Sequence, residues 1–252
     1  MSGAGRSRID QLLVERGLAE SRTRAQALIM AGLVYAGEKR LEKPGQTVAN
    51  DTDIEVRGRD HPWVSRGGLK LDHALTAFGI DVAGRIALDL GASTGGFTDV
   101  LLSRGAAKVY AVDVGHGQLA WALRQDERVV VLEKTNVRAL TAQQIPEAPA
   151  ILVADLSFIS IMLALPAAMA LAAPGALLVS LIKPQFEAGA GQVGKGGIVR
   201  DPTVHEAVCA TVRAWLADEM GWEVIGLVES PVTGTDGNRE FLIAAEKRDS
   251  SG

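Results

Sequence analysis

The sequence has very little cysteine or histidine from which a metal centre could be built. Cys209 is the one cysteine among the 252 residues, which excludes an internal disulfide and a cysteine-rich metal site. The four histidines, His61, His73, His116 and His205, show no metal-ligand spacing. We therefore expect no metal site, and a packing role for Cys209 within the helical pattern of residues 204–215.

The chain also lacks a long apolar run and an apolar start. The apolar stretch at residues 161–173 is shorter than the about 18 residues that a spanning helix needs, and it contains Pro166. The first six residues have no apolar signal core. Hydrophobic residues make up 47% and charged residues 22%, as in globular proteins. We expect a cytoplasmic protein with no membrane partner.

An overall excess of positive charge is absent too, because the net charge is −4. The charge is unevenly distributed, however. Residues 1–70 contain 12 Lys+Arg and 9 Asp+Glu, a net charge of +3, whereas the remainder contains 14 and 21, a net charge of −7. A local basic face is sufficient to contact phosphates, so the total does not exclude nucleic acid.

The first part of the chain, residues 1–58, has the pattern of two helices followed by a small sheet. Apolar residues at helical spacing end at Gly17, and a second helix is predicted to begin after Ser21, a suitable N-cap, and to end at Gly32. Short β-like segments follow at residues 33–35, 46–48 and 53–56. We take residues 59–63 as a linker, because glycine, charges and proline precede Trp63.

Four arginines are predicted to lie near the helix starts of this first domain, namely Arg6, Arg8, Arg22 and Arg24. Cations are unfavourable there because of the helix dipole. A phosphate backbone would compensate, which makes these arginines candidate RNA-binding residues; a solvated arginine face is the alternative. Residues 6–17, 21–25 and 31–34 with Gly37 resemble the RNA-binding domain named after the fourth small-subunit ribosomal protein.

Residues 64–252 form the second predicted domain, in which strands and helices alternate. The expected strands are residues 86–90, 109–114, 129–132, 151–155, 176–183, 223–228 and 241–246. The expected helices lie near residues 98–103, 117–123, 161–173 and 204–220. The loop between the last two strands is too short for a crossover helix, so they form an antiparallel hairpin. Five parallel strands closed by such a hairpin resemble the seven-stranded methyltransferase sheet. The expected fold is therefore α/β, a Rossmann-like seven-stranded methyltransferase sheet with a small α+β N-terminal RNA-binding domain.

A glycine turn between the first strand and its helix predicts a cofactor site. It comprises Asp89, Gly91, Ala92, Ser93, Thr94, Gly95, Gly96 and Phe97. Asp113 ends the next strand, where a carboxylate suits a ribose diol. Ser93 stands where a dinucleotide fingerprint needs its second glycine, and Asp89 precedes the turn, as in methyltransferases that use S-adenosylmethionine. A tight strand-to-helix connection without a ligand is the alternative.

Four ionisable residues are predicted to meet at the carboxyl edge of the sheet. Asp155 and Lys183 end the fourth and fifth strands there, Glu240 begins the antiparallel last strand, and Lys70 lies on the opening helix. A lysine that closes the apolar run at residues 177–182 is costly unless a carboxylate pairs with it. A structural ion-pair network is the alternative to a catalytic set.

These four residues match, in order and context, the Lys-Asp-Lys-Glu tetrad of FtsJ-like ribose 2′-O-methyltransferases. Thr94 stands where many of those proteins have proline. Longer matches, at residues 63–70, 91–97, 117–121, 154–160 and 183–187, resemble the TlyA family. The resemblance implies S-adenosylmethionine-dependent methylation of cytidine 2′-hydroxyls in ribosomal RNA or ribosomal subunits. It implies Lys70, Asp155, Lys183 and Glu240 as catalytic residues, with Lys183 orienting the hydroxyl and accepting or relaying its proton.

Other positions carry weaker predictions. Val114, Asn136 and Asp155 join the cofactor-binding set, although an asparagine at position 136 is nearly as well explained by a turn. We expect Phe158 to pack in the core, and stacking on a base or on the cofactor is the alternative. The rival functions are a non-catalytic RNA-binding assembly factor, a methyltransferase for another RNA or for protein, and the membrane activity suggested by an old haemolysin label in the family. The sequence leaves the oligomeric state and the modified nucleotide open.

Overall fold

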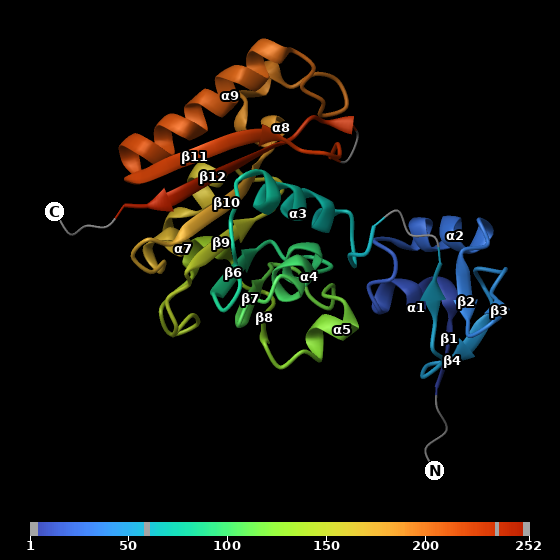
Figure 1. The fold of residues 1–252 in the computed structure, drawn as a ribbon. Coiled ribbons are helices and arrows are strands. Elements are labelled where there is room, and N and C mark those ends of the chain that lie inside the picture. The colour runs from blue at the N-terminus through green and yellow to red at the C-terminus, as the bar shows by residue number, and fades with distance from the viewer. Residues whose placement is uncertain (1–4, 58–60, 235–236, 249–252) are drawn as a thin grey trace.

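The computed structural model describes residues 5–57, 61–234 and 237–248. It shows a small unit beside a larger one that is built around a central sheet (Figure 1). Of the predicted linker, positions 59 and 60 lie outside the described residues, as does position 58, where we expect the first domain to end.

The small unit consists of two short helices and two small antiparallel sheets. Its elements are β1 (Arg6–Arg8), α1 (Ile9–Glu15), α2 (Arg22–Met30), β2 (Val34–Ala36), β3 (Lys39–Arg40), β4 (Thr47–Ala49) and β5 (Glu55–Val56). β1 pairs with β4, and β2 pairs with β3 and β5. Ser21 caps α2 by accepting a hydrogen bond from the backbone of Arg24, and Ile9, Leu13 and Ile29 form part of the core.

The first predicted helix begins later than expected, because Arg6 and Arg8 belong to strand β1. Arg8 is the N-cap of α1, whereas Arg6 lies opposite Ala49 in the β1–β4 ladder. The strand is short and polar, so its sequence has no apolar alternation to distinguish it from a helix start.

The larger unit is a seven-stranded sheet, as predicted. Its strands are β6 (Ile86–Leu90), β7 (Lys108–Val112), β8 (Val129–Leu132), β9 (Ile151–Ala154), β10 (Leu177–Ile182), β11 (Trp222–Glu229) and β12 (Phe241–Lys247). Their order is β11-β12-β10-β9-β6-β7-β8, with β12 antiparallel to both of its neighbours. The connection between β11 and β12 therefore returns at the edge where the parallel strands end.

Helices cover both faces of this sheet. They are α3 (Gly67–Ala77), α4 (Gly96–Ser103), α5 (Trp121–Arg124), α6 (Ile161–Ala164), α7 (Pro166–Ala170), α8 (Pro184–Glu187) and α9 (Pro202–Ala214), with short turns η1 (Val137–Ala139), η2 (Ala190–Gln192) and η3 (Trp215–Glu219). Leu71 and Leu101 belong to the core on one face, and Met169 and Val212 to the core on the other.

Two helices are shorter than the sequence predicts. The predicted helix at residues 117–123 begins only at Trp121. The predicted helix at residues 161–173 divides into α6 and α7 before Pro166, which lacks the N–H that would continue the α6 ladder. Within the described residues, no helix is long and apolar enough to cross a membrane. The same part of the chain holds no cluster of three His, Cys, Asp or Glu residues suited to a metal ion.

The two units meet directly beside the carboxyl edge of the sheet. The backbone N–H of Arg66 donates a hydrogen bond of 3.1 Å to Glu20 Oε1 of the small unit. Gly17, with φ +65°, lies so close to Ala120 that a β-carbon at position 17 would come within 2.3 Å of the alanine methyl. Trp63 packs just as closely against Gly68 of α3, because a β-carbon at position 68 would lie 2.3 Å from the tryptophan side chain. The described part of the linker is thus fixed to the larger unit.

Candidate active site

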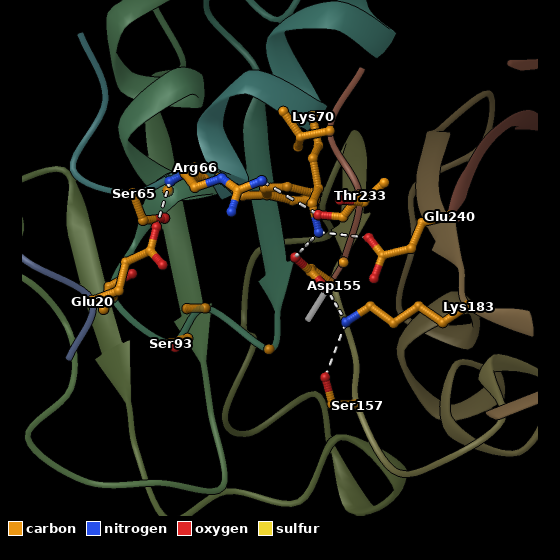
Figure 2. A pocket seen from close by; sticks show the side chains of 18 residues that line it. Glu20, Ser65, Arg66, Lys70, Ser93, Asp155, Ser157, Lys183, Thr233 and Glu240 are labelled. Atoms are coloured by element: carbon orange, nitrogen blue, oxygen red, sulfur yellow. Dashed lines mark hydrogen bonds and ion pairs between the residues drawn. The ribbon is translucent and has the colours of Figure 1, made fainter. Parts of the chain in front are cut away.

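Two adjoining cavities lie at the carboxyl edge of the sheet. One, of about 430 Å³, contains Lys70, Asp155, Lys183 and Glu240; Figure 2 shows its lining side chains. The other, of about 500 Å³, is bordered by Asp113 and Asn136, among other residues. They share Gly91, Ser93, Asp155 and Ser157. Together they form one cleft with a charged half and a more apolar half.

The predicted tetrad is assembled around Asp155. Lys183 Nζ lies 2.5 Å from Asp155 Oδ1, and Lys70 Nζ lies 3.8 Å from Asp155 Oδ2. Lys70 also donates a hydrogen bond of 2.6 Å to Glu240 Oε2. The side chains of Lys183 and Glu240 are only 9% and 3% exposed. In Figure 2 the two ammonium groups lie on opposite sides of the Asp155 carboxylate.

The charges of this cluster offset one another. Burial lowers the pKa of Lys70, but the carboxylates of Asp155 and Glu240 outweigh it, so the pKa is raised above its ordinary value. Lys70 therefore remains a cation at neutral pH. Two ammonium groups facing two carboxylates keep the cavity close to neutral, which makes their burial tolerable.

Two residues outside the tetrad complete its geometry. The Ser157 hydroxyl accepts a hydrogen bond of 3.0 Å from Lys183 Nζ. Gly234, in the connection between β11 and β12, touches Glu240: a β-carbon there would lie 2.0 Å from Glu240 Oε1. Sequence reasoning missed both, although Ser157 stands two residues from Asp155 and Gly234 lies in the loop before Glu240.

The glycine turn after β6 has the conformation that a cofactor turn needs. Gly91 has φ +85°, and a β-carbon there would meet the backbone oxygen of Asp155 at 2.6 Å. Ser93 has φ +48°, which is unusual for a residue other than glycine and is typical of a site under constraint. Its N–H donates a hydrogen bond of 2.8 Å to Asp113 Oδ2, while Gly115 N–H donates one of 2.6 Å to Asp113 Oδ1.

Most of the predicted cofactor residues border the cleft. Gly91, Ser93, Asp113, Val114, Asn136 and Asp155 line the larger cavity, and Ala92, Thr94, Gly96 and Phe97 line the smaller one. Gly95 lines neither; it has φ +97° and packs against Leu123. Asn136 also accepts a hydrogen bond from the backbone of Arg138, so it serves as a turn residue as well. Gln118, Leu156 and Ile159 also line the larger cavity and were missed.

Asp89 does not reach either cavity. Its side chain is fully buried and accepts a hydrogen bond of 2.6 Å from the Thr98 hydroxyl of α4, while its Oδ1 has no hydrogen-bond partner. Burial raises its pKa to about 7. Asp89 thus lies beneath the glycine turn and supports α4 from below, where the sequence predicted direct contact with the cofactor.

The loop after β9 is tied to the segment after β10. Glu187 of α8 accepts hydrogen bonds of 2.7 Å from the Ser160 hydroxyl and 2.9 Å from the Ile161 backbone, and burial raises its pKa. The rings of Phe158 and Phe186 lie 5.2 Å apart. The prediction that Phe158 packs in the core is wrong, because 90% of its surface is exposed. Its φ of +65° turns the loop outward at this point.

The arginines of the small unit have a different environment from the predicted one. Arg8 and Arg22 each donate a hydrogen bond of 2.9 Å to the fully buried Asp10, so their compensating charge lies inside the domain. The hydrogen bond from Arg8 is the main reason that the pKa of Asp10 lies well below its usual range. Arg6 donates to the Thr47 carbonyl, and Arg24 is exposed.

Comparison with known families identifies both units. Residues 7–54 match the S4 domain, and residues 63–247 match the FtsJ-like methyltransferase family. The chain belongs to the FtsJ-like methyltransferases. This membership confirms the predicted seven-stranded methyltransferase fold and S-adenosylmethionine as the methyl donor. It also favours the catalytic prediction over the non-catalytic alternative.

Individual relatives of this FtsJ-like methyltransferase cover nearly the whole chain. A 16S/23S rRNA (cytidine-2′-O)-methyltransferase, TlyA of Mycobacterium tuberculosis, is 52% identical over 95% of this chain and 90% of its own. Hemolysin A of Brachyspira hyodysenteriae is 41% identical over 93% and 98%. The structure of a candidate hemolysin from Streptococcus thermophilus, 46% identical, superposes with a TM-score of 0.75 over 98% and 90%. The predicted resemblance to the TlyA family is thereby confirmed.

Proposed function

We propose that this protein transfers a methyl group from S-adenosylmethionine to the 2′-hydroxyl of a cytidine in ribosomal RNA. The observation that carries the proposal is the gathering of Lys70, Asp155, Lys183 and Glu240 in one cavity that opens into the cofactor half of the cleft. The M. tuberculosis relative, which has this activity by name, covers 95% of the chain. The nucleotide specificity proposed here follows that relative.

The larger cavity suits the nucleoside part of the cofactor. Asp113 offers a carboxylate to a ribose diol, and the apolar side chains of Val114, Val137 and Leu156 suit an adenine ring. When bound, S-adenosylmethionine supplies a methyl group activated by its sulfonium. We assign Gly91 and Ser93 to backbone contacts at the junction of the two halves. In this proposal Asp89 supports α4 beneath the glycine turn through its hydrogen bond with Thr98.

The tetrad would prepare the ribose hydroxyl. Lys183 Nζ is held by Asp155 and Ser157, which leaves one further N–H to direct at the ribose oxygen. The Asp155 carboxylate would accept a proton from Lys183, and the amine so formed would take up the hydroxyl proton as the ribose oxygen is methylated. Lys70 and Glu240 keep Asp155 in place. Orientation of this kind can lower a barrier by roughly 7–11 kcal/mol.

The small unit would bring structured RNA to this cleft. We propose that residues 1–58 form the RNA-binding domain, residues 59–63 the linker and residues 64–252 the methyltransferase domain. Arg6, Arg8, Arg22 and Arg24 are the proposed phosphate contacts, and such contacts make binding sensitive to salt. Since ribosomal subunits are the proposed substrates, a cytoplasmic location is part of the same proposal.

Methyl transfer to separated ribosomal subunits tests this function. The protein is incubated with each subunit and with S-adenosylmethionine that carries a labelled methyl group, and the labelled RNA is digested to nucleosides. We expect label in 2′-O-methylcytidine at one position in at least one subunit, and none from Lys183→Ala. Label in a base, in ribosomal protein or in no product would overturn the proposal.

A further inference from the structure

A third cavity, of about 700 Å³, lies at the seam between the two domains. The small domain contributes Glu20 and Arg24, and the larger domain contributes Ser65 and Arg66. Glu20, Ser65, Arg66 and Val232 border the catalytic cavity as well, so the two cavities are continuous. Figure 2 shows Glu20 and Arg66 in contact at this junction. A strand of RNA in the catalytic cavity can therefore extend into the seam.

The seam cavity contains two arginines, Arg24 and Arg66, together with the carboxylate of Glu20. Arg24 and Arg66 are exposed, and within the described residues neither forms an ion pair. The Arg66 guanidinium donates one long hydrogen bond, of 3.5 Å, to the Thr233 carbonyl. Arg8 and Arg22, in contrast, are both bound to Asp10. Arginines without a carboxylate partner are available to phosphate groups, which supply most of the affinity of RNA-binding surfaces.

The lining between these arginines suits a base. Leu18, Leu33 and Leu69 provide apolar surface. Glu20 accepts the Arg66 backbone N–H with Oε1, and its second oxygen remains an acceptor. A carboxylate repels a phosphate but accepts a hydrogen bond from an amino group such as that of cytosine. The cavity volume lies within the range of small-ligand sites. Phosphates would pair with the two arginines, and a base would cover the apolar leucines and donate a hydrogen bond to Glu20.

We propose that the seam cavity is a subsite for the nucleotide next to the one that is methylated, with Arg24 and Arg66 on its phosphates and its base on the apolar lining. This inference rests on the proposed function, because it takes the RNA in the catalytic cavity as its starting point. It adds a specific place where the S4 domain and the methyltransferase domain hold the same strand.

Site-directed crosslinking tests the proposal. Ala27 is exposed and lines the seam, and Cys209 is buried, so Ala27→Cys in a Cys209→Ala background offers one reactive thiol for a photoreactive maleimide. Ala210→Cys, exposed on α9, is the matched control. With the ribosomal subunit that accepts methyl, we expect crosslinks from position 27 within about two nucleotides of the methylated ribose, and none there from position 210.

Two results separate failure of this subsite from failure of the proposed function. If unlabelled wild-type protein transfers no methyl to RNA, the proposed function fails, and the subsite fails with it. If methyl transfer occurs but crosslinks from position 27 map elsewhere, or resemble those from position 210, only the subsite is overturned.

Kinetics of an arginine variant provide an independent test. We expect Arg24→Ala to raise the KM for RNA roughly fivefold with kcat little changed, and to lower the slope of log affinity against log salt by about one. Arg24→Lys should keep most of the affinity, since it keeps the charge. Arg213→Ala, an exposed arginine on α9, is the control. An unchanged KM and salt slope for Arg24→Ala would overturn the phosphate contact.

Discussion

Two buried aspartates, one in each domain, have opposite ionisation behaviour. Asp10 in the small domain and Asp89 in the larger one are both fully buried. Asp10 faces two guanidinium groups, and its pKa is lowered well below the usual range. Asp89 accepts a hydrogen bond from the Thr98 hydroxyl, and burial raises its pKa to about 7. Burial alone does not decide the charge of a carboxyl group; the neighbouring cations do.

Asp155 of the tetrad resembles Asp10 in having cations on both sides, but these cations differ in exposure. Asp155 has ammonium groups on both sides, as Asp10 has guanidinium groups, but both lysines are buried whereas Arg8 and Arg22 are about half exposed. Exposed arginines around a buried acid remain open to phosphates. Buried lysines around an acid reach only a group that enters the cavity. In the proposed function, the same charge pattern serves RNA binding in one domain and chemistry in the other.

The largest expected effect concerns the pH dependence of stability through Asp89. Its pKa is about 7 in the folded protein and near 3.8 in the unfolded chain, so the folded state holds the proton more tightly. The stabilisation that Asp89 provides is complete below about pH 4. As the pH rises from there to about 7, the free energy of unfolding falls by roughly 2–4 kcal/mol. Urea unfolding of Asp89→Asn should lack this decline. Parallel pH profiles for the two proteins would contradict the assignment.

Removal of Asp10 should have the next largest effect. Asp10→Ala leaves Arg8 and Arg22 without their shared acceptor, and we expect the free energy of unfolding to fall by about 2 kcal/mol. RNA affinity should fall as well, because the two guanidinium groups lose their fixed positions. The lowered pKa means that the stabilisation by Asp10 is present above about pH 4 and is lost only in stronger acid. Unchanged stability of Asp10→Ala at neutral pH would show that the cluster is not a structural unit.

The sequence predicted the larger domain more completely than the charge environments within it. Continuous apolar runs such as Ile151–Ala154 and Leu177–Ile182 specify buried parallel strands, and the short loop before β12 specifies its antiparallel pairing with β11. The tetrad could be predicted because strand ends meet at one edge. Local pattern does not show the side of a strand on which an acid lies, which is why Asp89 was placed in the cavity.

The errors in the small domain and in the loops have a similar origin. From the sequence alone, Asp10 has the pattern of a solvated helix residue. Only the structure shows that Arg8 and Arg22 contact it. Phe158 is apolar and follows a buried strand, yet its positive φ turns it outward. A single sequence carries no direct signal for a positive φ at a residue other than glycine.

A glycine in the hairpin loop offers a smaller but more specific test of the tetrad. Gly234→Ala would bring a β-carbon to within 2.0 Å of Glu240 Oε1, which must displace the carboxylate from Lys70. We expect kcat to fall about tenfold while cofactor affinity changes little. Gly191→Ala, where a β-carbon meets no atom within 4 Å, is the matched control. Equal activity of the two variants would argue against a role for Glu240 in positioning.

The smallest expected effect concerns the link between the two loops at the cleft. Glu187→Ala removes the acceptor for Ser160 and Ile161, so the segment that lines the cofactor cavity loses a support. We expect cofactor affinity to fall about threefold, as measured by calorimetry. Glu187→Gln should restore it, because the amide oxygen can still accept the Ile161 N–H. Equal affinity of the alanine variant and the wild type would exclude this support.

The most direct measurement for the account as a whole is single-turnover methyl transfer by Lys183→Ala, combined with its affinity for S-adenosylmethionine and for RNA. Lys183 touches Asp155 and Ser157 in the charged half of the cleft and does not border the cavity that we assign to the cofactor. We predict a rate lowered by at least about 100-fold with both affinities within about threefold of wild type. Transfer at the wild-type rate would contradict the catalytic role of the tetrad, and loss of cofactor binding would contradict the division of the cleft.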